Sequence, residues 1–242
     1  MKIYVVGLGP GGEDQIIPRA LDALEQSDII VGYDRYIELI KPRFSHKQLL
    51  STPMKKEVER CRLAIDKALE GFTVSMVSSG DAGVYGMAGI MYETAANFKE
   101  IEIEVIPGIT AACSGAAILG APLISDFAVI SLSDLLTPWD KIEKRLSGAA
   151  LADFVICLYN PSSKTRHDYL AKACDIIRRY QRADIPAGIV RNIGRSGENY
   201  EIMTLEELRE KQVDMYTTVF IGNSQTKVIK NKIVTPRGYK LI

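Results

Sequence analysis

Short runs of β-branched and apolar residues alternate with amphipathic stretches along the first half of the chain. The strand-like runs are KIYVVGL, SDIIVGY, FTVSMVS and EIEVIP, and helix-like runs lie between them at Pro18–Gln26, Lys55–Glu70 and Val84–Phe98. Pro18 suits the first turn of a helix, and Gly71 suits a C-terminal cap after the second run. Alternation at this spacing is typical of βαβ units, so we expect an α/β fold with a mostly parallel first sheet.

The pattern changes between Ala112 and Phe127. The segment CSGAAILGAPLIS is small and apolar, which predicts a short helix followed by a link. Beyond it, FAVISLS and DFVICLYN predict strands, TPWDKIEKRLSGAA and RHDYLAKACDIIRRY predict helices, and IPAGIVRNIG, NYEIMTL and MYTTVFIGNS predict closely spaced strands. Strands with little helix between them favour antiparallel pairing. We therefore expect two α/β domains, residues 1–115 and 125–242, the second with a mixed sheet.

Five loop signatures follow strand-like runs in a fixed order. They are GLGPGG at Gly7–Gly12, SSGDAGVYG at Ser78–Gly86, IPGITA at Ile106–Ala111, LSDLLTPW at Leu132–Trp139 and YNPSSKTR at Tyr159–Arg166. Ligands of open α/β sheets bind at the carboxyl ends of the strands. The five loops therefore predict a large composite site.

The first loop also matches the G-x-G-x-x-G pattern of dinucleotide-binding folds, and Asp34 stands near the expected position of a ribose-binding acid. In that fold the helix starts inside the glycine loop, and its N–H groups hold the pyrophosphate. Here Pro10 removes one donor, and Pro18 indicates that the helix starts several residues later. An NAD-dependent oxidoreductase using Gly7–Gly12 is therefore an alternative that the loop geometry disfavours.

Bulk composition narrows the choice of function. The chain has 242 residues, 47% of them hydrophobic, and a net charge of +0, which gives no support for non-specific attraction to nucleic acid or membranes. No apolar run approaches the length of a bilayer span. The N-terminus opens directly into a strand and lacks the pattern of a leader peptide, so we expect a cytoplasmic protein.

The cysteines and histidines give no metal-binding pattern. The four cysteines contain no C-x-x-C pair, and the only histidines are His46 and His167. We expect no protein-bound metal and four reduced thiols, at least two of them buried in helices or strands. These cysteines are Cys61, Cys113, Cys157 and Cys174.

Asp81 has two interpretations within Ser78–Gly86. The glycines of this loop allow backbone to approach a ligand closely, with Asp81 at the strand end. Alternatively, its carboxylate caps the free N–H groups of the following helix. In the next loop, the small residues after Pro107-Gly108 permit close packing against a flat ligand, or plain packing of helix on sheet.

The loop motifs together resemble the tetrapyrrole (corrin/porphyrin) methyltransferase family. GLGPG, SSGDAGVYG and IPGITA carry the general resemblance. ISLSDLLTPW, YNPSSKTR, GIVRNIGR, TTVFIGN and TPRGY are similar to the branch that methylates C17 and contracts the ring of precorrin-3B or cobalt-factor III type tetrapyrroles in cobalamin biosynthesis. The resemblance covers nearly the whole chain. Ala82 stands where relatives often have proline, a departure that matches the ring-contracting branch.

This resemblance implies an S-adenosylmethionine-dependent C-methyltransferase that releases S-adenosylhomocysteine. It implies two α/β domains with the active-site cleft between them, the first on the tetrapyrrole side and the second completing the S-adenosylmethionine site. It also implies a homodimer. The substrate either carries cobalt or is metal-free, and likeness to short members of the branch favours the cobalt form. A non-catalytic tetrapyrrole carrier is a further alternative, which leaves SSGDAGVYG unexplained.

The resemblance also assigns residues to the ligands. Backbone groups are expected to hold the cofactor at Pro10, Ser79, Gly80, Asp81, Val84, Thr110, Ala111, Tyr159, Asn160, Arg191 and Asn192. The substrate is a polycarboxylate, and arginine grips carboxylates with a two-donor fork. Substrate-binding candidates are Gly9, Arg35, Ser133, Lys164, Arg166, Arg195 and Arg237, although solvated surface charge is the alternative for the cations.

The expected chemistry needs few catalytic groups. Methyl transfer from a sulfonium to an electron-rich ring carbon mainly requires alignment, which supplies roughly 7–11 kcal/mol of the barrier. Family chemistry in the ring contraction attaches an acetate side chain to the extruded carbon as a lactone and moves protons, so an acid or base is expected. The unranked candidates are Asp34, Asp81, Tyr85 and Asp134. Asp34 matches the YDR motif at which related enzymes place a proposed base, but it could equally cap a helix at Arg35–Ile40.

Overall fold

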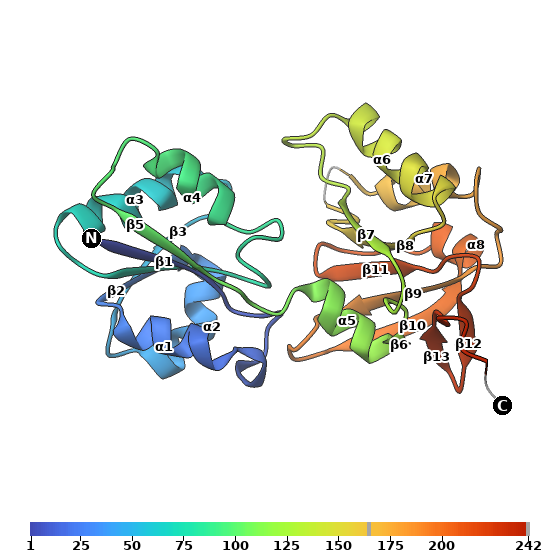
Figure 1. Cartoon of the computed structure of the whole chain (residues 1–242), viewed down its shortest axis with the longest axis horizontal. Coiled ribbons are helices and arrows are strands. Elements are labelled where there is room, and N and C mark those ends of the chain that lie inside the picture. Colours follow the sequence, from blue (N-terminus) through green and yellow to red (C-terminus); the bar gives the residue numbers. More distant parts are fainter. Residues whose placement is uncertain (164–165, 241–242) are drawn as a thin grey trace. The chain divides into compact units, whose positions relative to one another are not determined.

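The computed structural model describes residues 1–163 and 166–240, and the chain divides into two compact units, Met1–Ala111 and Ala112–Ile242 (Figure 1). Each unit is built around its own five-stranded sheet. No helix of the described residues is long and apolar enough to cross a bilayer.

The first unit contains a fully parallel sheet with strand order β3-β2-β4-β1-β5. Its strands are β1 (Lys2–Gly7), β2 (Ile29–Tyr33), β3 (Gln48–Thr52), β4 (Val74–Ser78) and β5 (Glu102–Ile106). Its helices are α1 (Pro18–Gln26), α2 (Asp34–Phe44), α3 (Glu57–Leu69) and α4 (Ala88–Ala95), with a 3-10 turn, η1, at Glu13–Gln15. Figure 1 shows α1 and α2 on one face and α3 and α4 on the other.

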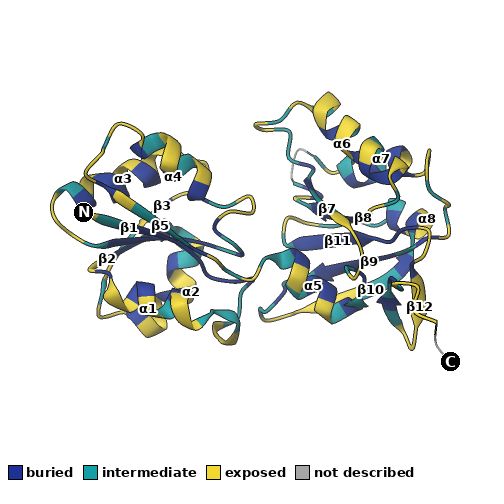
Figure 2. Cartoon of the chain, in the orientation of Figure 1, coloured by how far each residue is buried: buried dark blue, intermediate teal, exposed yellow. Residues whose placement is uncertain are grey.

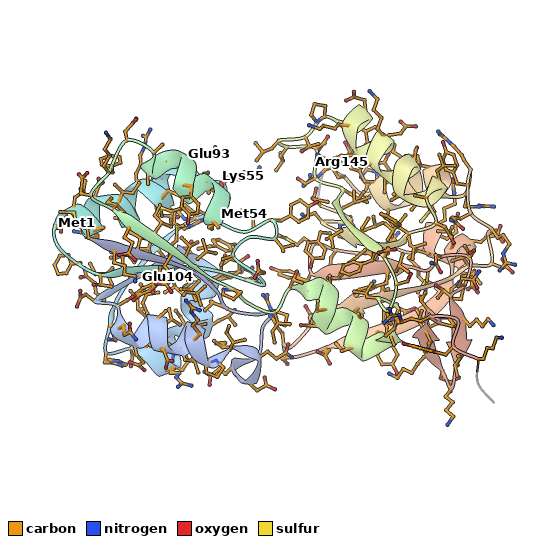
Figure 3. All side chains as sticks on the ribbon, viewed as in Figure 1. Met1, Met54, Lys55, Glu93, Glu104 and Arg145 are labelled. Atoms are coloured by element: carbon orange, nitrogen blue, oxygen red, sulfur yellow. The ribbon has the colours of Figure 1, made fainter. Side chains whose placement is uncertain are left out.

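Alternating strand residues supply the two cores of this unit. Ile3 and Val5 pack with the α3 and α4 layer, whereas Tyr4 and Val6 pack with α1 and α2. Both faces are covered, so the central strands are almost continuously buried, as Figure 2 shows in dark blue. At the outer edge of the sheet lies β5, whose Glu104 is labelled in Figure 3. Its carboxylate pairs with Lys2 at 2.8 Å and with Arg19 at 2.6 Å.

The second unit contains a mixed sheet with strand order β10-β9-β11-β8-β7. Its strands are β7 (Phe127–Ser131), β8 (Val155–Tyr159), β9 (Pro186–Arg191), β10 (Asn199–Thr204) and β11 (Thr217–Ile221). β7 pairs parallel with β8, while β11 runs antiparallel to β8 and β9, and β10 antiparallel to β9. The carboxyl ends of β7, β8 and β9 therefore lie at one edge.

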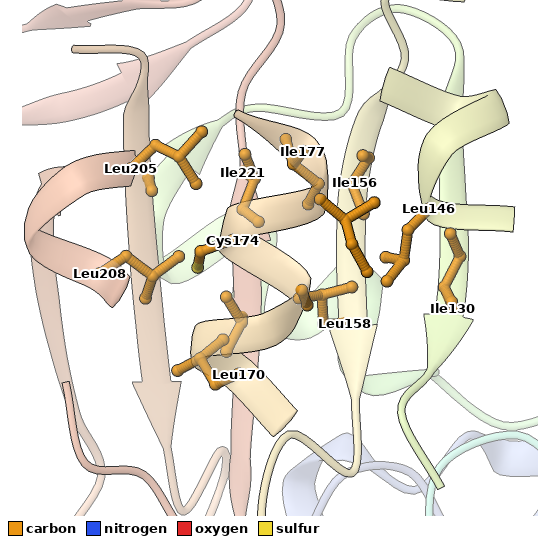
Figure 4. Packing of buried hydrophobic residues seen from close by; sticks show 14 of the residues in the cluster. Ile130, Leu146, Ile156, Leu158, Leu170, Cys174, Ile177, Leu205, Leu208 and Ile221 are labelled. Carbon is orange, nitrogen blue, oxygen red and sulfur yellow. The ribbon is translucent and has the colours of Figure 1, made fainter. Parts of the chain in front are cut away.

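Helices α6 (Trp139–Leu151), α7 (Tyr169–Ile177) and α8 (Leu205–Arg209) cover one face of this sheet. Figure 4 shows Leu146, Leu170 and Leu205 packed with strand residues of that core. On the opposite face lies α5 (Ala111–Leu119), where a Cβ added to Gly115 would stand 2.8 Å from the ring of Phe220. A small sheet of order β12-β13-β6 adds β6 (Gly120–Ala121), β12 (Lys227–Ile229) and β13 (Lys232–Val234).

The predicted fold class is confirmed: one parallel and one mixed sheet, with the closely spaced strands paired antiparallel. Three of the four thiols, those of Cys61, Cys157 and Cys174, are buried in helices or a strand, as expected. The helix expected from Val84 begins only at Ala88, because the loop before it includes Tyr85 at a φ of 52°. A left-handed residue cannot continue an α-helix.

Several short elements escaped the sequence pattern. β3 is an edge strand with only two apolar residues in QLLST, so its alternation is weak. The five-residue helix α8 carries a capping box between Thr204 and Glu207, a T-x-x-E signal that could have located it. The hairpin of β12 and β13 turns at Lys230 and Asn231, both at positive φ.

Candidate functional site

Three of the five loop signatures, those that contain glycine, follow adjacent strands of the first unit. β4, β1 and β5 are neighbours in the parallel sheet, so their carboxyl ends share one edge (Figure 1). Residues 7–12, 78–86 and 106–111 therefore meet there. This confirms that each of these loops lies at the carboxyl end of a strand.

Backbone hydrogen bonds join the first two loops beyond the sheet. The N–H of Leu8 donates to the carbonyl of Ser78 at 2.9 Å, and Gly9 and Gly80 exchange N–H···O bonds of 3.0 and 2.7 Å. These N–H groups are consequently already used inside the protein. A pyrophosphate could not take them without breaking the contact.

At two positions of this edge only glycine fits, because a side chain would have no room. A Cβ on Gly7 would stand 2.6 Å from the carbonyl oxygen of Gly80, and one on Gly108 would collide with the same oxygen. Gly9 and Gly80 are instead required for conformation, with φ of 76° and 68°. The three loops thus touch backbone to backbone, and together they form a glycine-lined edge of the first unit.

The carboxylate of Asp81 links the loop after β4 to the loop after β5. Its Oδ1 accepts the N–H groups of Gly83 at 2.7 Å and Val84 at 3.1 Å, and its Oδ2 accepts the N–H of Gly108 at 2.9 Å. The capping alternative is wrong, because the following helix begins at Ala88 with Met87 at its N-cap position. Asp81 instead fixes its own loop and anchors it to the loop after β5.

Asp34 and Tyr85 lie at the same edge of the first unit. Asp34 is the first residue of α2, directly after β2, and no side chain in the described part of the chain makes the cap hydrogen bond of that helix. The capping interpretation of Asp34 therefore has no support either. Tyr85 is 56% exposed and stands in the left-handed region, a strained position for an aromatic residue.

The other cofactor candidates of this unit lie on the same three loops as Asp81 or directly after them. Pro10 and Gly80 are buried, Ser79 is half-buried and Val84 is exposed. Thr110 and Ala111 stand at the start of α5, after the Pro107-Gly108 turn. Gly9, a substrate candidate, is buried in the Gly9–Gly80 bridge.

In the second unit, the loops after β7 and β8 meet through side chains. The N–H of Leu132 donates to the carbonyl of Tyr159 at 2.9 Å, and the amide of Asn160 donates to Ser131 Oγ at 2.9 Å. Tyr159 turns its hydroxyl to the N–H of Ala112 at 2.7 Å, at the start of α5. Asn160 has a φ of 52° and is exposed.

Asp134 is held by a network of polar side chains. Tyr169 donates to its Oδ2 at 2.6 Å, and Arg166 contacts its Oδ1 at 3.4 Å and donates to Ser133 Oγ at 2.6 Å. The Tyr169 hydrogen bond and the Arg166 charge lower the pKa of Asp134, and the carboxylate raises the pKa of Tyr169. Asp134 is therefore ionised at neutral pH and is poorly suited to donate a proton.

Arg191 and Asn192 follow the same edge at the end of β9. Arg191 donates from Nη2 to the carbonyl of Gln212 at 2.6 Å, while its Nε is buried without an acceptor in the described residues. Asn192 has a φ of 52°, as Asn160 does, and its carbonyl accepts the N–H of Arg195 at 2.8 Å. The guanidinium of Arg195 lies 5.9 Å from the ring centre of Tyr216.

The structure does not gather all predicted cations at these edges. Arg237 follows β13 of the small sheet rather than a strand of either large one. Arg35, by contrast, is exposed in the first turn of α2, next to Asp34 at the carboxyl-end edge of the first sheet. Lys164 lies outside the described residues. Tyr169, the partner of Asp134, was missed by sequence reasoning because it stands 35 positions away on a helix.

Comparisons with known proteins agree with the loop signatures. The family model for "Tetrapyrrole (Corrin/Porphyrin) Methylases" matches residues 2–209. The chain is 45% identical to a "Probable cobalt-factor III C(17)-methyltransferase" of Salmonella typhimurium, over 99% of this chain and 100% of that protein. It is 38% identical to a precorrin-3B C(17)-methyltransferase of Sinorhizobium sp, over 98% and 96%. The crystal structure of the methyltransferase CobJ superposes with a TM-score of 0.90 at 36% identity, covering 97% of this chain and 99% of that one.

Proposed function

The chain belongs to the tetrapyrrole (corrin/porphyrin) methylases, and we propose that it methylates C17 of a cobalt-factor III or precorrin-3B type tetrapyrrole in cobalamin biosynthesis, with contraction of the ring. The observation that carries this proposal is the 45% identity with the Salmonella cobalt-factor III relative along the full length of both chains. The family resemblance in the loop motifs is thereby confirmed.

The cobalt-containing substrate is the better supported of the two. Identity to the Salmonella cobalt-factor III relative is 45%, against 38% to the Sinorhizobium precorrin-3B relative. We therefore propose cobalt-factor III as the preferred substrate and the metal-free precorrin as the weaker one.

S-adenosylmethionine is proposed as the methyl donor, and the first unit offers a surface that fits it. When bound, the donor supplies an electrophilic sulfonium methyl group. The glycine-lined edge presents main chain at close range, and Asp81 holds the loops of that edge in place. Pre-fixed loops need no reordering on binding, which favours the alignment that methyl transfer requires.

The same geometry argues against the oxidoreductase alternative. α1 begins at Pro18, after the turn Glu13–Gln15, so the Gly7–Gly12 loop does not open a helix. The N–H groups of Leu8 and Gly9 are engaged by β4 and its loop. The N–H groups that hold a dinucleotide pyrophosphate, those of the glycine loop and of a helix starting in it, are therefore not available.

Ring contraction requires a proton to be moved, and Asp34 is the candidate we favour. Asp134 is committed to Tyr169 and Arg166, and Asp81 accepts three backbone N–H groups. Asp34, at the start of α2, makes no comparable set of bonds within the described residues, and it matches the YDR motif of the proposed base. Asp34→Asn should lower the rate of ring contraction at least tenfold while leaving the affinity for S-adenosylhomocysteine within twofold. Equal contraction rates in both proteins, followed in single turnovers by the absorption spectrum of the ring, would exclude Asp34 as the base.

The proposed function is tested by calorimetry with S-adenosylhomocysteine and by turnover. The protein is incubated with S-adenosylmethionine and either cobalt-factor III or precorrin-3B, and the methylated product is followed by mass. We expect donor binding and a mass gain of one methyl group, faster with the cobalt substrate. Tetrapyrrole binding without donor binding would favour the carrier alternative, and bound NAD(H) would favour the oxidoreductase. The expected homodimer and cytoplasmic location stay predictions.

A further inference from the structure

Three polar side-chain atoms of the first unit are buried without a hydrogen-bond partner among the described residues. They are Thr52 Oγ1, Arg60 Nε and Ser78 Oγ. Their residues are only 5%, 4% and 4% exposed. A buried polar atom left without a partner costs about 1–3 kcal/mol, so three in one unit call for an explanation.

The strand register brings these atoms to one place. Thr52 pairs with Tyr33, and Gly32 pairs with Val77, so Ser78 stands level with Tyr33 on the other side of β2. Side chains two residues apart on a strand point to the same face. Leu50, Val31 and Met76 pack with the α3 and α4 core, so Thr52, Tyr33 and Ser78 turn toward the same layer. The row lies at the carboxyl-end edge of the sheet.

Arg60 reaches this row from α3. It donates from Nη2 to the carbonyl of Pro53, next to Thr52, at 3.1 Å, and its guanidinium lies 5.9 Å from the ring centre of Tyr33. Its Nη1 lies 3.7 Å from the sulfur of Met87, a weak acceptor. No carboxylate of the described residues stands within ion-pair distance of Arg60.

A cation buried among neutral partners is costly, because desolvation is not repaid by an opposite charge. The atoms that lack partners are one guanidinium N–H and two hydroxyls, and all three can donate. The complementary ligand is a compact anion that only accepts hydrogen bonds. A carboxylate meets this need, since its two oxygens can accept from the arginine and a hydroxyl together.

We propose that Thr52, Arg60 and Ser78 form a carboxylate-binding subsite, which takes a side-chain carboxylate of the tetrapyrrole substrate. That this carboxylate belongs to the tetrapyrrole rests on the proposed function. Ser78 is the last residue of β4 and leads directly into the loop of Asp81, so the subsite adjoins the glycine-lined edge. An arriving carboxylate replaces the Met87 sulfur as the acceptor for Arg60. In this role Arg60 positions the substrate and takes no part in bond making.

The subsite itself is tested without turnover. Crystals of the whole protein are soaked in 3-bromopropionate, and the anomalous signal of bromine marks the bound carboxylate. We expect bromine density beside Arg60, with carboxylate oxygens near Nε and the two hydroxyls. Ordered water alone at these three atoms would overturn the proposal.

The source of the carboxylate is tested with three variants. Arg60→Met removes the charge, Arg60→Lys retains it, and Arg62→Met is the control on the same helix, because Arg62 is exposed. The probes are uroporphyrin III, its methyl ester, and S-adenosylhomocysteine, whose own carboxylate is the competing source. We expect Arg60→Met to weaken binding of the free acid 10- to 100-fold and binding of S-adenosylhomocysteine less than twofold. Arg60→Lys should recover part of the loss, and Arg62→Met should change neither affinity.

A structural role for Arg60 predicts a different result. The unfolding temperature of Arg60→Met would then fall, while the folded protein would keep its affinity for uroporphyrin III. Thr52→Val, a milder change, should keep the fold and weaken binding of the free acid 3- to 10-fold without affecting the ester. Loss of S-adenosylhomocysteine affinity instead would overturn the tetrapyrrole assignment. Arg60-dependent binding in a protein that transfers no methyl group would refute the proposed function and leave the subsite standing.

Discussion

The two units both gather predicted site residues at the carboxyl ends of their strands, but they build these edges differently. In the first unit, glycine backbones touch directly, and one carboxylate, that of Asp81, binds N–H groups of two loops. In the second unit, side chains of Ser133, Asp134, Arg166 and Tyr169 hold the loops. Where loops touch through their backbones, even one added methyl group forces a loop to move. Where side chains hold the loops, a single substitution removes one hydrogen bond and leaves the others in place.

Gly108→Ala should give the largest effect and the sharpest test of this contrast. The new Cβ would collide with the carbonyl of Gly80, so one of the two loops must move. We expect a loss of about 1–3 kcal/mol in the free energy of unfolding. Donor binding should fall as well. Gly89→Ala is the matched control, because nothing lies within 4 Å of its added Cβ and alanine favours a helix. Equal stability of the two variants in denaturant titrations would contradict the backbone-built description.

Asp81→Ala should weaken cofactor binding more than it weakens the fold. Removing the carboxylate frees the N–H groups of Gly83, Val84 and Gly108, and the two loops lose their tie. We expect the Kd for S-adenosylhomocysteine to rise at least tenfold, about 1.4 kcal/mol, by calorimetry. A lower unfolding temperature with unchanged affinity would limit Asp81 to a structural role.

Tyr169→Phe should give the smallest loss of stability, because Asp134 loses one hydrogen bond but keeps its contact with Arg166. Loss of the hydroxyl donor should cost about 0.5–1.5 kcal/mol at neutral pH. The Tyr169 bond depresses the pKa of Asp134, so its contribution is present above the unfolded pKa, near 4, and is lost as the pH falls through the folded pKa. The difference in stability between the two proteins should therefore shrink as the pH falls below about 4 and disappear below the folded pKa. Curves that stay parallel across the acid range would show that Tyr169 does not act through the Asp134 charge.

Sequence reasoning went furthest where a local pattern carried the information. The helix at Pro18–Gln26 followed from a proline and an apolar period, and the positions of the loops at strand ends followed from their spacing. Edge strand β3 was missed because burial on a sheet edge leaves little alternation in the sequence. Asp81 was identified as important, but its partner Gly108 lies 27 residues away and gave no local signal.

The chain by itself determined the α/β class, the order of its loops and the family, because these depend on periodicities and on short motifs that each occupy a few consecutive residues. Only the tertiary structure decided which atoms meet: that Gly108 has no room for a Cβ, that Asp134 is already bonded to Tyr169, and that Arg60 is buried without a counter-charge among the described residues. The physical reason is that strand register and sheet order bring together residues dozens of positions apart, and no pattern along the chain specifies those distances.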